Sequence, residues 1–242
     1  MSDLRLEGIT KRFGKVTAID NLSLRIRARE FLVLVGASGC GKTTLLRIVA
    51  GLERPDSGEI YMGGACVNLI PVGKRNVQMI FQSYALWPHM KVFDERKYSN
   101  LGFPLKIRNW TPDSIMARVQ EVARRVGLEN TLFSRQPDTL SAGQKQRVAL
   151  SRALTTAPQI FLMDEPMANL DPPSRARVRH EIKKLHREMG TTTLFVTHNM
   201  TDAFEMADRM AIMRDGHLVQ LGTEEELRRA PADQYVVDFL HS

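Results

Sequence analysis

Apolar and polar residues alternate along two segments near the start of the chain, Leu4–Ile9 and Ala18–Ile26. This period of two is typical of antiparallel strands that bury one face. Phe31–Val35 is instead an uninterrupted apolar run, which predicts a strand buried on both faces. Three later runs have the same character: Val77–Phe81, Gln159–Met163 and Thr192–Val196.

Helical periodicity separates these strands. Thr111 followed by Pro112 predicts the start of a helix, and Gly127 predicts its end. A shorter helix is expected over Lys42–Ala50, closed by Gly51. On the longer helix, apolar residues spaced four, three and four apart form one stripe: Ile115, Val119, Val122 and Val126.

The last third of the chain carries three local signals. A helix is expected to open at Pro172. Its apolar face comprises Val178, Ile182, Leu185 and Met189. Asp215-Gly216 is a hairpin turn signal between two apolar runs, and Thr223 with Glu226 is a capping-box pattern for a late helix.

Strands that alternate with helices predict an α/β fold in which helices cover a mostly parallel sheet. The two alternating segments add an N-terminal antiparallel β part, and the helical stretch in the middle of the chain forms an inserted α-helical subdomain. The boundaries suggested by this pattern are a core over residues 1–85 and 155–222, a helical subdomain over 86–154 and a C-terminal helical tail over 223–242.

Composition narrows the class of protein. Hydrophobic residues make up 43% of the 242 residues and charged residues 25%, which excludes a disordered chain. The apolar runs are too short to span a bilayer, and the N-terminus lacks an apolar signal segment. Cys40 and Cys66 are too few for a disulfide framework or a zinc site. We therefore expect a reduced, soluble, cytoplasmic protein whose net charge of +7 is spread along the chain.

The residues from Gly36 to Thr43, GASGCGKT, fit the phosphate-binding pattern G-x-x-x-x-G-K-[ST] between a buried strand and a helix. Glycines let backbone N–H groups turn toward phosphate oxygens, and the helix N-terminus adds positive potential. Lys42 would reach the β- and γ-phosphates, and the Thr43 hydroxyl would bind Mg²⁺. The nucleotide-binding residues expected here are Gly36, Ser38, Gly39, Cys40, Gly41, Lys42, Thr43 and Thr44. The alternative is a chance glycine-rich turn. With the motif, the fold prediction becomes a P-loop NTPase core that binds a nucleotide.

Asp164 and Glu165 end the apolar run Ile160–Met163. Beside the phosphates, Asp164 can hold Mg²⁺ through water, and Glu165 is suited to polarise an attacking water molecule. Without a phosphate loop, both residues would more simply be solvated acids at a strand end.

Residues 140–154, LSAGQKQRVALSRAL, resemble the signature motif of ATP-binding-cassette (ABC) ATPases, usually LSGGQ followed by a basic helix. The resemblance implies a second anion site, in which Ser141, Gly143 and Gln144 of one copy close over the nucleotide of another copy. The alternative is an amphipathic helix with a serine cap. Ala142 departs from the usual first glycine of the pair and disfavours a left-handed backbone there.

Other elements of the ABC family follow in order. By resemblance, Gln82 contacts Mg²⁺, Asp171 belongs to a loop that crosses the dimer interface, and His198 binds the γ-phosphate. Phe13 fits the aromatic residue that stacks on adenine. The alternatives are a structural or solvent-facing histidine and a core phenylalanine. Asn199 stands where an acidic residue often follows the histidine.

Residues 76–90, NVQMIFQSYALWPHM, resemble importer ATPases for sugars, polyamines, inorganic anions or osmolytes. That resemblance implies a homodimer, or a dimer with a similar ATPase subunit, on the inner face of the membrane. It also implies integral membrane permease subunits as partners, a solute-binding protein as an indirect partner, and no nucleic acid. Trp87, Met90 and Phe93 would line the groove for a permease helix or, alternatively, close the subdomain's own core. Near residues 95–99 the chain is longer than expected for such importers. This extra segment forms either a solvated bulge or the rim of the groove.

Two other functions stay open on the sequence. A soluble ABC-type ATPase acting on nucleic acid or the ribosome fits the positive charge, but would be expected to carry a coiled-coil insertion or a second cassette. A small-molecule P-loop kinase would not need the motif at residues 140–144.

Overall fold

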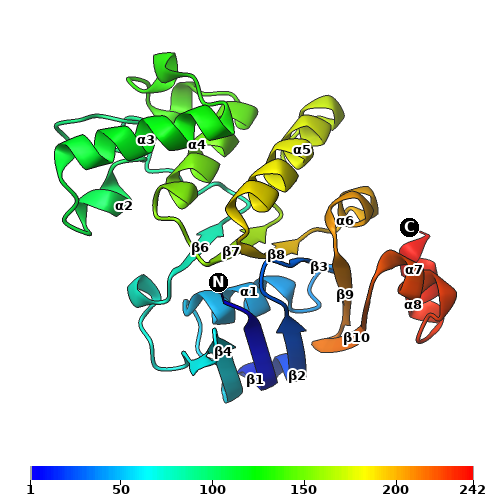
Figure 1. The fold of residues 1–242 in the computed structure, drawn as a ribbon. Helices are drawn as coiled ribbons and strands as arrows, with labels where there is room; N and C mark the ends of the chain where they lie inside the picture. Colours follow the sequence, from blue (N-terminus) through cyan, green and yellow to red (C-terminus); the bar gives the residue numbers. More distant parts are fainter. Residues whose placement is uncertain (1, 242) are drawn as a thin grey trace. The chain divides into compact units, whose positions relative to one another are not determined.

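The computed structural model describes residues 2–241, which divide into two compact units (Figure 1). The core unit contains the chain up to Met79, Gln159–Glu165 and the chain from His186 onward. The helical unit contains Ile80–Pro158 and Pro166–Leu185. Among the described residues, no helix is long and apolar enough to cross a membrane.

An antiparallel sheet with the strand order β2-β1-β4-β5 forms one layer of the core unit. Its strands are β1 (Leu4–Phe13), β2 (Val16–Ile26), β4 (Ser57–Met62) and β5 (Ala65–Cys66). Leu4, Leu6 and Ile9 of β1 are buried, as are Leu22 and Leu24 of β2, so the predicted alternation is confirmed.

The second sheet of the core unit has six strands in the order β10-β9-β3-β8-β7-β6. They are β3 (Phe31–Gly36), β6 (Val77–Ile80), β7 (Ile160–Asp164), β8 (Thr192–Val196), β9 (Arg209–Arg214) and β10 (His217–Gly222). β3 pairs in parallel with β8 and β9, and β8 pairs in parallel with β7. The runs at β3, β7 and β8 are fully buried as expected. The prediction for Val77–Phe81 was wrong in this respect, because β6 is an edge strand and is only partly buried.

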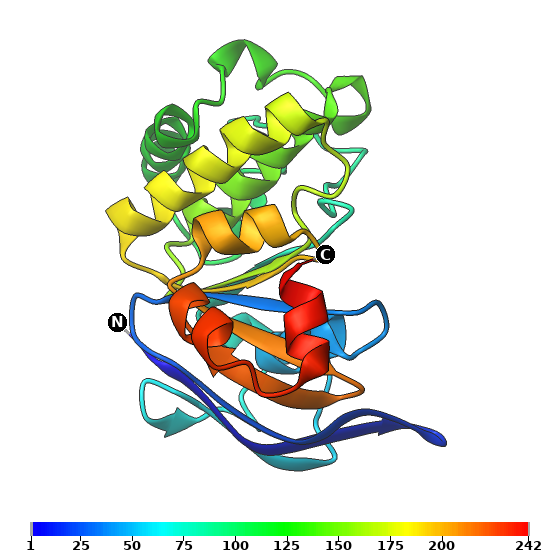
Figure 2. The same cartoon turned by 90° about the vertical axis from the view of Figure 1, so that its right-hand side faces the viewer.

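Helix α1 (Lys42–Ala50) contacts β2 of the antiparallel sheet and β3, β7 and β8 of the parallel one. Gly51 ends α1 with a left-handed backbone (φ 78°), as predicted. The β9–β10 turn is also as predicted, since Asp215 and Gly216 both have positive φ. The remaining helices of this unit are α6 (Met200–Met206), α7 (Glu224–Arg229) and α8 (Gln234–Leu240), with a 3-10 turn η1 at Val72–Lys74. Figure 2 shows α7 and α8 beside the β9–β10 hairpin.

The helical unit contains α2 (Phe103–Lys106), α3 (Pro112–Val126), α4 (Ala142–Thr155) and the 3-10 turns η2 (Asn130–Leu132) and η3 (Pro137–Thr139). Thr111 caps α3 by accepting the Ser114 N–H, Gly127 ends it, and the predicted apolar stripe is buried. The core around α3 includes Phe93, which packs edge-to-face on Phe133 at 5.4 Å. The assignment of Phe93 to a permease groove was therefore wrong, since its ring fills the unit's own core.

Helix α5 (Pro172–Met189) belongs mostly to the helical unit, whereas the sequence pattern predicts it as part of the core. Arg147 on α4 pairs with Glu181 on α5 at 3.0 Å. Val178, Ile182 and Leu185 are buried as the apolar face predicted, whereas Met189 of that face is only partly buried. The last turn returns to the core unit, where the His186 ring packs on Phe31 at 5.0 Å.

Residues 95–99 are held by local hydrogen bonds. The Asp94 carboxylate accepts the N–H groups of Arg96 and Lys97, each at 3.0 Å. Lys106 donates to the Lys97 carbonyl at 2.7 Å, and Ser99 is fully buried. Residues 95–98 are exposed, so the segment is a solvated loop that is anchored by these hydrogen bonds and by buried Ser99. Its role at the rim of the groove stays a prediction.

Candidate functional site

The phosphate loop connects β3 to α1, in the predicted strand–turn–helix arrangement. A Cβ atom on Gly36 would overlap the Met213 carbonyl oxygen, and one on Gly41 would overlap the Ala18 carbonyl oxygen. Both positions therefore require glycine, and Gly41 has a left-handed backbone (φ 103°). Because Gly41 is the N-cap of α1 and has no side chain, it leaves the first N–H groups of the helix to a ligand.

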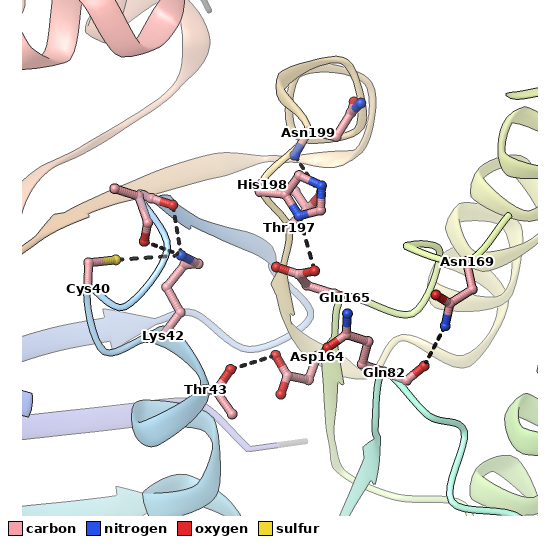
Figure 3. A network of polar contacts seen from close by, with 12 residues as sticks. Cys40, Lys42, Thr43, Gln82, Asp164, Glu165, Asn169, Thr197, His198 and Asn199 are labelled. Atoms are coloured by element: carbon pink, nitrogen blue, oxygen red, sulfur yellow. Dashed lines mark hydrogen bonds and ion pairs between the residues drawn. The ribbon is translucent and has the colours of Figure 1, made fainter. Parts of the chain in front are cut away.

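Lys42 lies inside the loop and is only 7% exposed (Figure 3). Its ammonium group donates to the carbonyl oxygens of Gly36 at 2.7 Å and Ala37 at 2.8 Å, and contacts Cys40 Sγ at 3.6 Å. A bound phosphate would replace these neutral acceptors with charged ones, which form stronger hydrogen bonds.

Thr43 and Asp164 place two side-chain oxygen atoms next to each other at the end of β7. Thr43 Oγ1 donates to Asp164 Oδ1 at 3.1 Å. Burial raises the pKa of Asp164, and the hydrogen bond from Thr43 partly opposes that shift. A cation beside this carboxylate would stabilise its ionised form. Hydroxyl and carboxylate oxygens are the ligands that Mg²⁺ accepts when substrate phosphates complete the site. These residues therefore fit Mg²⁺.

Glu165 and His198 meet beside this pair. His198 Nδ1 lies 3.1 Å from Glu165 Oε2. Glu165 has a left-handed backbone (φ 46°), and its N–H donates to the Val196 carbonyl at 3.0 Å, which aims the side chain at the end of β8. Because the His198 side chain is 60% exposed, it is not a core histidine. The contact with His198 therefore defines the orientation of the Glu165 carboxylate.

Asn199, where an acidic residue was the usual expectation, caps α6. Its side-chain oxygen accepts the Asp202 N–H at 2.9 Å, and its own N–H donates to Thr197 Oγ1 at 3.0 Å. Asparagine is among the best N-cap residues, so the departure preserves the geometry next to His198.

Phe13 ends β1 and is 49% exposed, with the Lys11 ammonium 5.1 Å from the ring centroid. The alternative of a core phenylalanine was therefore wrong. An exposed ring is available for stacking, and its contact with adenine stays a prediction.

Ser141 and Gln144 form a capping box at the start of α4. Ser141 Oγ accepts the Gln144 N–H at 3.3 Å, and Gln144 Oε1 accepts the Ser141 N–H at 3.0 Å. Ala142 is the first residue of α4 and follows an extended Ser141, so alanine fits this position. The space around Gly143 is open.

Gln82 and Asp171 also lie in the helical unit. Gln82 is exposed, and its carbonyl accepts a hydrogen bond from Asn169 Nδ2 at 3.3 Å (Figure 3). Asp171 caps α5, and its hydrogen bonds with Ser174 lower the pKa of the carboxyl. The core unit thus brings together Lys42, Thr43, Asp164, Glu165 and His198. The approach of Gln82, Ser141, Gly143, Gln144 and Asp171 to a nucleotide stays a prediction.

Arg152 on α4 is a supporting residue that sequence reasoning missed. It donates to the carbonyl oxygens of Ala85 at 2.6 Å and Tyr84 at 2.9 Å, two residues with positive φ in the turn after Gln82. Its guanidinium lies 4.8 Å from the Trp87 ring centroid, and burial lowers the pKa of Arg152 to about 10. No local pattern connects residues almost seventy positions apart, so the sequence carried no signal for this contact.

Comparisons with known proteins identify the family of this chain. The ABC transporter family profile matches residues 19–168. The chain is 47% identical over its whole length to a trehalose/maltose import ATP-binding protein, MalK, of Thermococcus litoralis. It is 45% identical to an oligosaccharides import ATP-binding protein, MsmX, of Bacillus subtilis. The chain spans 65% of the length of each of these two relatives.

Solved structures share the fold. The dimeric ATP-binding cassette MJ0796, described in a post-hydrolysis state bound to ADP and Pi, superposes with a TM-score of 0.80 at 29% identity. The superposition covers 91% of this chain and 98% of that one. The predicted P-loop NTPase fold and the resemblance are therefore confirmed, and the chain belongs to the ABC transporter family.

Proposed function

We propose that this chain hydrolyses ATP as the energy-supplying subunit of an importer for small solutes. The observation that carries the proposal is the cluster of Lys42, Thr43, Asp164, Glu165 and His198 around an uncapped helix N-terminus. Relatives named for the import of trehalose or maltose, xylose or arabinose, and oligosaccharides support a sugar as the solute.

Hydrolysis would begin with the ATP phosphates in the loop. Lys42 exchanges the carbonyls of Gly36 and Ala37 for β- and γ-phosphate oxygens. Thr43 and Asp164 would hold Mg²⁺, with Gln82 as a further ligand. When bound, this ion neutralises charge that develops on the phosphoryl oxygens.

Glu165 orients and polarises the attacking water molecule. The water oxygen forms a bond to the γ-phosphorus while the bond from that phosphorus to the β–γ bridging oxygen breaks. His198 Nδ1, at 3.1 Å from Glu165, defines the carboxylate position. With both ring nitrogens protonated, the same imidazolium would also donate through Nε2 to a γ-phosphate oxygen. The water proton leaves toward Glu165, and ADP and inorganic phosphate are the products.

Two copies of the chain would enclose two ATP molecules. Each nucleotide lies in one copy's loop and against Ser141, Gly143 and Gln144 of the other copy, with Asp171 near the dimer interface. The dimeric MJ0796 cassette supports this arrangement. Phe13 would stack on adenine.

Membrane permease subunits would receive the movement of this dimer, with a solute-binding protein as an indirect partner. Trp87 and Met90 are partly exposed on the helical unit and remain candidates for that contact. The chain would then lie on the inner face of the membrane. The relatives are import proteins, so the alternative of acting on nucleic acid is not supported.

Phosphate release from ATP tests the proposal. The purified chain should release phosphate from ATP only with Mg²⁺, and co-purified permease subunits should change the rate whereas DNA should not. Stimulation by DNA alone would refute the importer role, and transfer of phosphate to a small-molecule acceptor would identify a kinase instead.

A further inference from the structure

Tyr235 of the last helix, α8, reaches the phosphate loop from the opposite end of the chain. Its hydroxyl accepts the Ala37 N–H at 3.4 Å and donates to the Met213 carbonyl at 3.1 Å. Ala37 is the second residue of the loop, and Met213 lies in β9. One hydroxyl therefore joins the loop to a neighbouring strand.

The Met213 carbonyl also faces Gly36, where a side chain would overlap it. The rest of the same hairpin supports the loop further along, since the Gly216 N–H donates to the Cys40 carbonyl at 3.2 Å. The β9–β10 hairpin thus contacts the phosphate loop at Gly36 and at Cys40, and the Tyr235 hydroxyl links the first turn of the loop to β9 through hydrogen bonds.

Several contacts hold the Tyr235 side chain in position. The Arg214 guanidinium lies 4.9 Å from the ring centroid and pairs with Asp233 at 2.9 Å. Asp233 also caps α8 by accepting the Val236 N–H at 3.0 Å, and Val236 is fully buried. Burial raises the pKa of Tyr235, so the hydroxyl keeps its proton at neutral pH and can donate to Met213.

We propose that Tyr235 is a positioning residue that couples α8 to the nucleotide affinity of the phosphate loop. The inference rests on the proposed ATP binding. The hydroxyl pairs the Ala37 N–H within the protein and leaves the N–H groups nearer α1 for phosphate. Ordering this turn before the ligand arrives lowers the conformational entropy lost on binding. A displacement of α8 would remove the hydroxyl and weaken ATP binding.

Tyr235→Phe removes the hydroxyl and keeps the ring. The expected result is a rise of about three- to tenfold in the KM and Kd for ATP, the range of one or two net hydrogen bonds, with kcat within about twofold. Amide hydrogen exchange of the nucleotide-free chain should be faster in a peptide covering residues 36–41.

Tyr61→Phe is the matched control, because it removes a hydroxyl that donates to Glu59 at 2.6 Å in the antiparallel sheet. It should leave KM and exchange in the loop unchanged. Asp233→Asn is a second variant, since asparagine still caps α8 but loses the ion pair with Arg214. As a single substitution, Asp233→Asn should raise the KM for ATP. Combined with Tyr235→Phe, it should raise the KM no further.

The proposal is overturned if Tyr235→Phe matches Tyr61→Phe in both KM and loop exchange. It is also overturned if Tyr235→Phe lowers only the melting temperature. Failure of the unaltered chain to bind ATP would contradict the proposed function. Faster loop exchange in Tyr235→Phe would still support the fastening of the loop by α8.

Discussion

Replacing Glu165 with glutamine should retain ATP binding and nearly abolish hydrolysis. The substitution keeps the shape of the side chain and a hydrogen-bonding partner for His198 Nδ1, which lies 3.1 Å from the carboxylate. Glutamate and glutamine have the same cost in the left-handed backbone conformation of position 165, so the substitution should leave the fold intact. What it removes is the negative charge that accepts a proton from water.

The expected size of the effect follows from that role. A positioned general base contributes about 10²- to 10⁴-fold to a rate. At about 1.4 kcal/mol per tenfold, the loss in kcat corresponds to about 3–5 kcal/mol of barrier. Because the Lys42 and Thr43 contacts stay, the Kd for ATP should change by less than about threefold.

Single-turnover phosphate release measures the chemical step, and gel filtration with ATP and Mg²⁺ should show a stable dimer of the variant. Glu225→Gln is the matched control, because Glu225 is an exposed carboxylate on α7. It should keep the unaltered rate and remain monomeric during turnover. Wild-type turnover by Glu165→Gln would refute the catalytic assignment, and a monomer with bound ATP would refute the shared nucleotide.

Three further substitutions separate binding, stacking and burial. Lys42→Ala should weaken ATP binding by about 10- to 100-fold and stop turnover, because it removes charged hydrogen bonds to phosphate; unchanged affinity by calorimetry would contradict this. Phe13→Ala should weaken ATP binding by about 1 kcal/mol, or about fivefold, without lowering the melting temperature of the chain. A lower melting temperature with unchanged calorimetric affinity would mean that another residue stacks on adenine. Asp164→Asn should raise the melting temperature at pH 7, because burial raises the pKa of Asp164 and its ionised form destabilises the folded chain. That gain should shrink as pH falls through the folded-state pKa and vanish below about pH 4; a lower melting temperature at pH 7 would contradict it.

Local chemistry made some elements predictable to the residue. Helix α3 begins at Pro112 and ends at Val126, because a threonine cap, an N1 proline and a left-handed glycine act within one turn of each end. The phosphate loop was predictable for the same reason, since its glycines, lysine and threonine are contiguous.

Features that depend on distant neighbours were not predictable. The apolar run at β6 does not reveal that it is an edge strand, because strand order is a property of the whole sheet. Phe93 was assigned to a surface groove because its partner Phe133 is forty residues away. The contact between Tyr235 and Ala37 joins residues 198 positions apart, and no periodicity encodes it.

The capping box at the start of α4 affects the entropy of association between two copies. In the free chain, the Ser141 and Gln144 side chains each already accept a hydrogen bond from the other residue's backbone N–H. In the proposed dimer, a phosphate arriving with the second copy meets side chains that have little rotational freedom left to lose. The saving is about 0.5–1.5 kcal/mol for each rotamer-rich side chain. Ser141→Ala would therefore remove the acceptor of the residue 144 N–H. Gln144→Ala would keep that hydrogen bond and lose only the side chain that accepts the Ser141 N–H, so it should weaken ATP-driven dimerisation less than Ser141→Ala does.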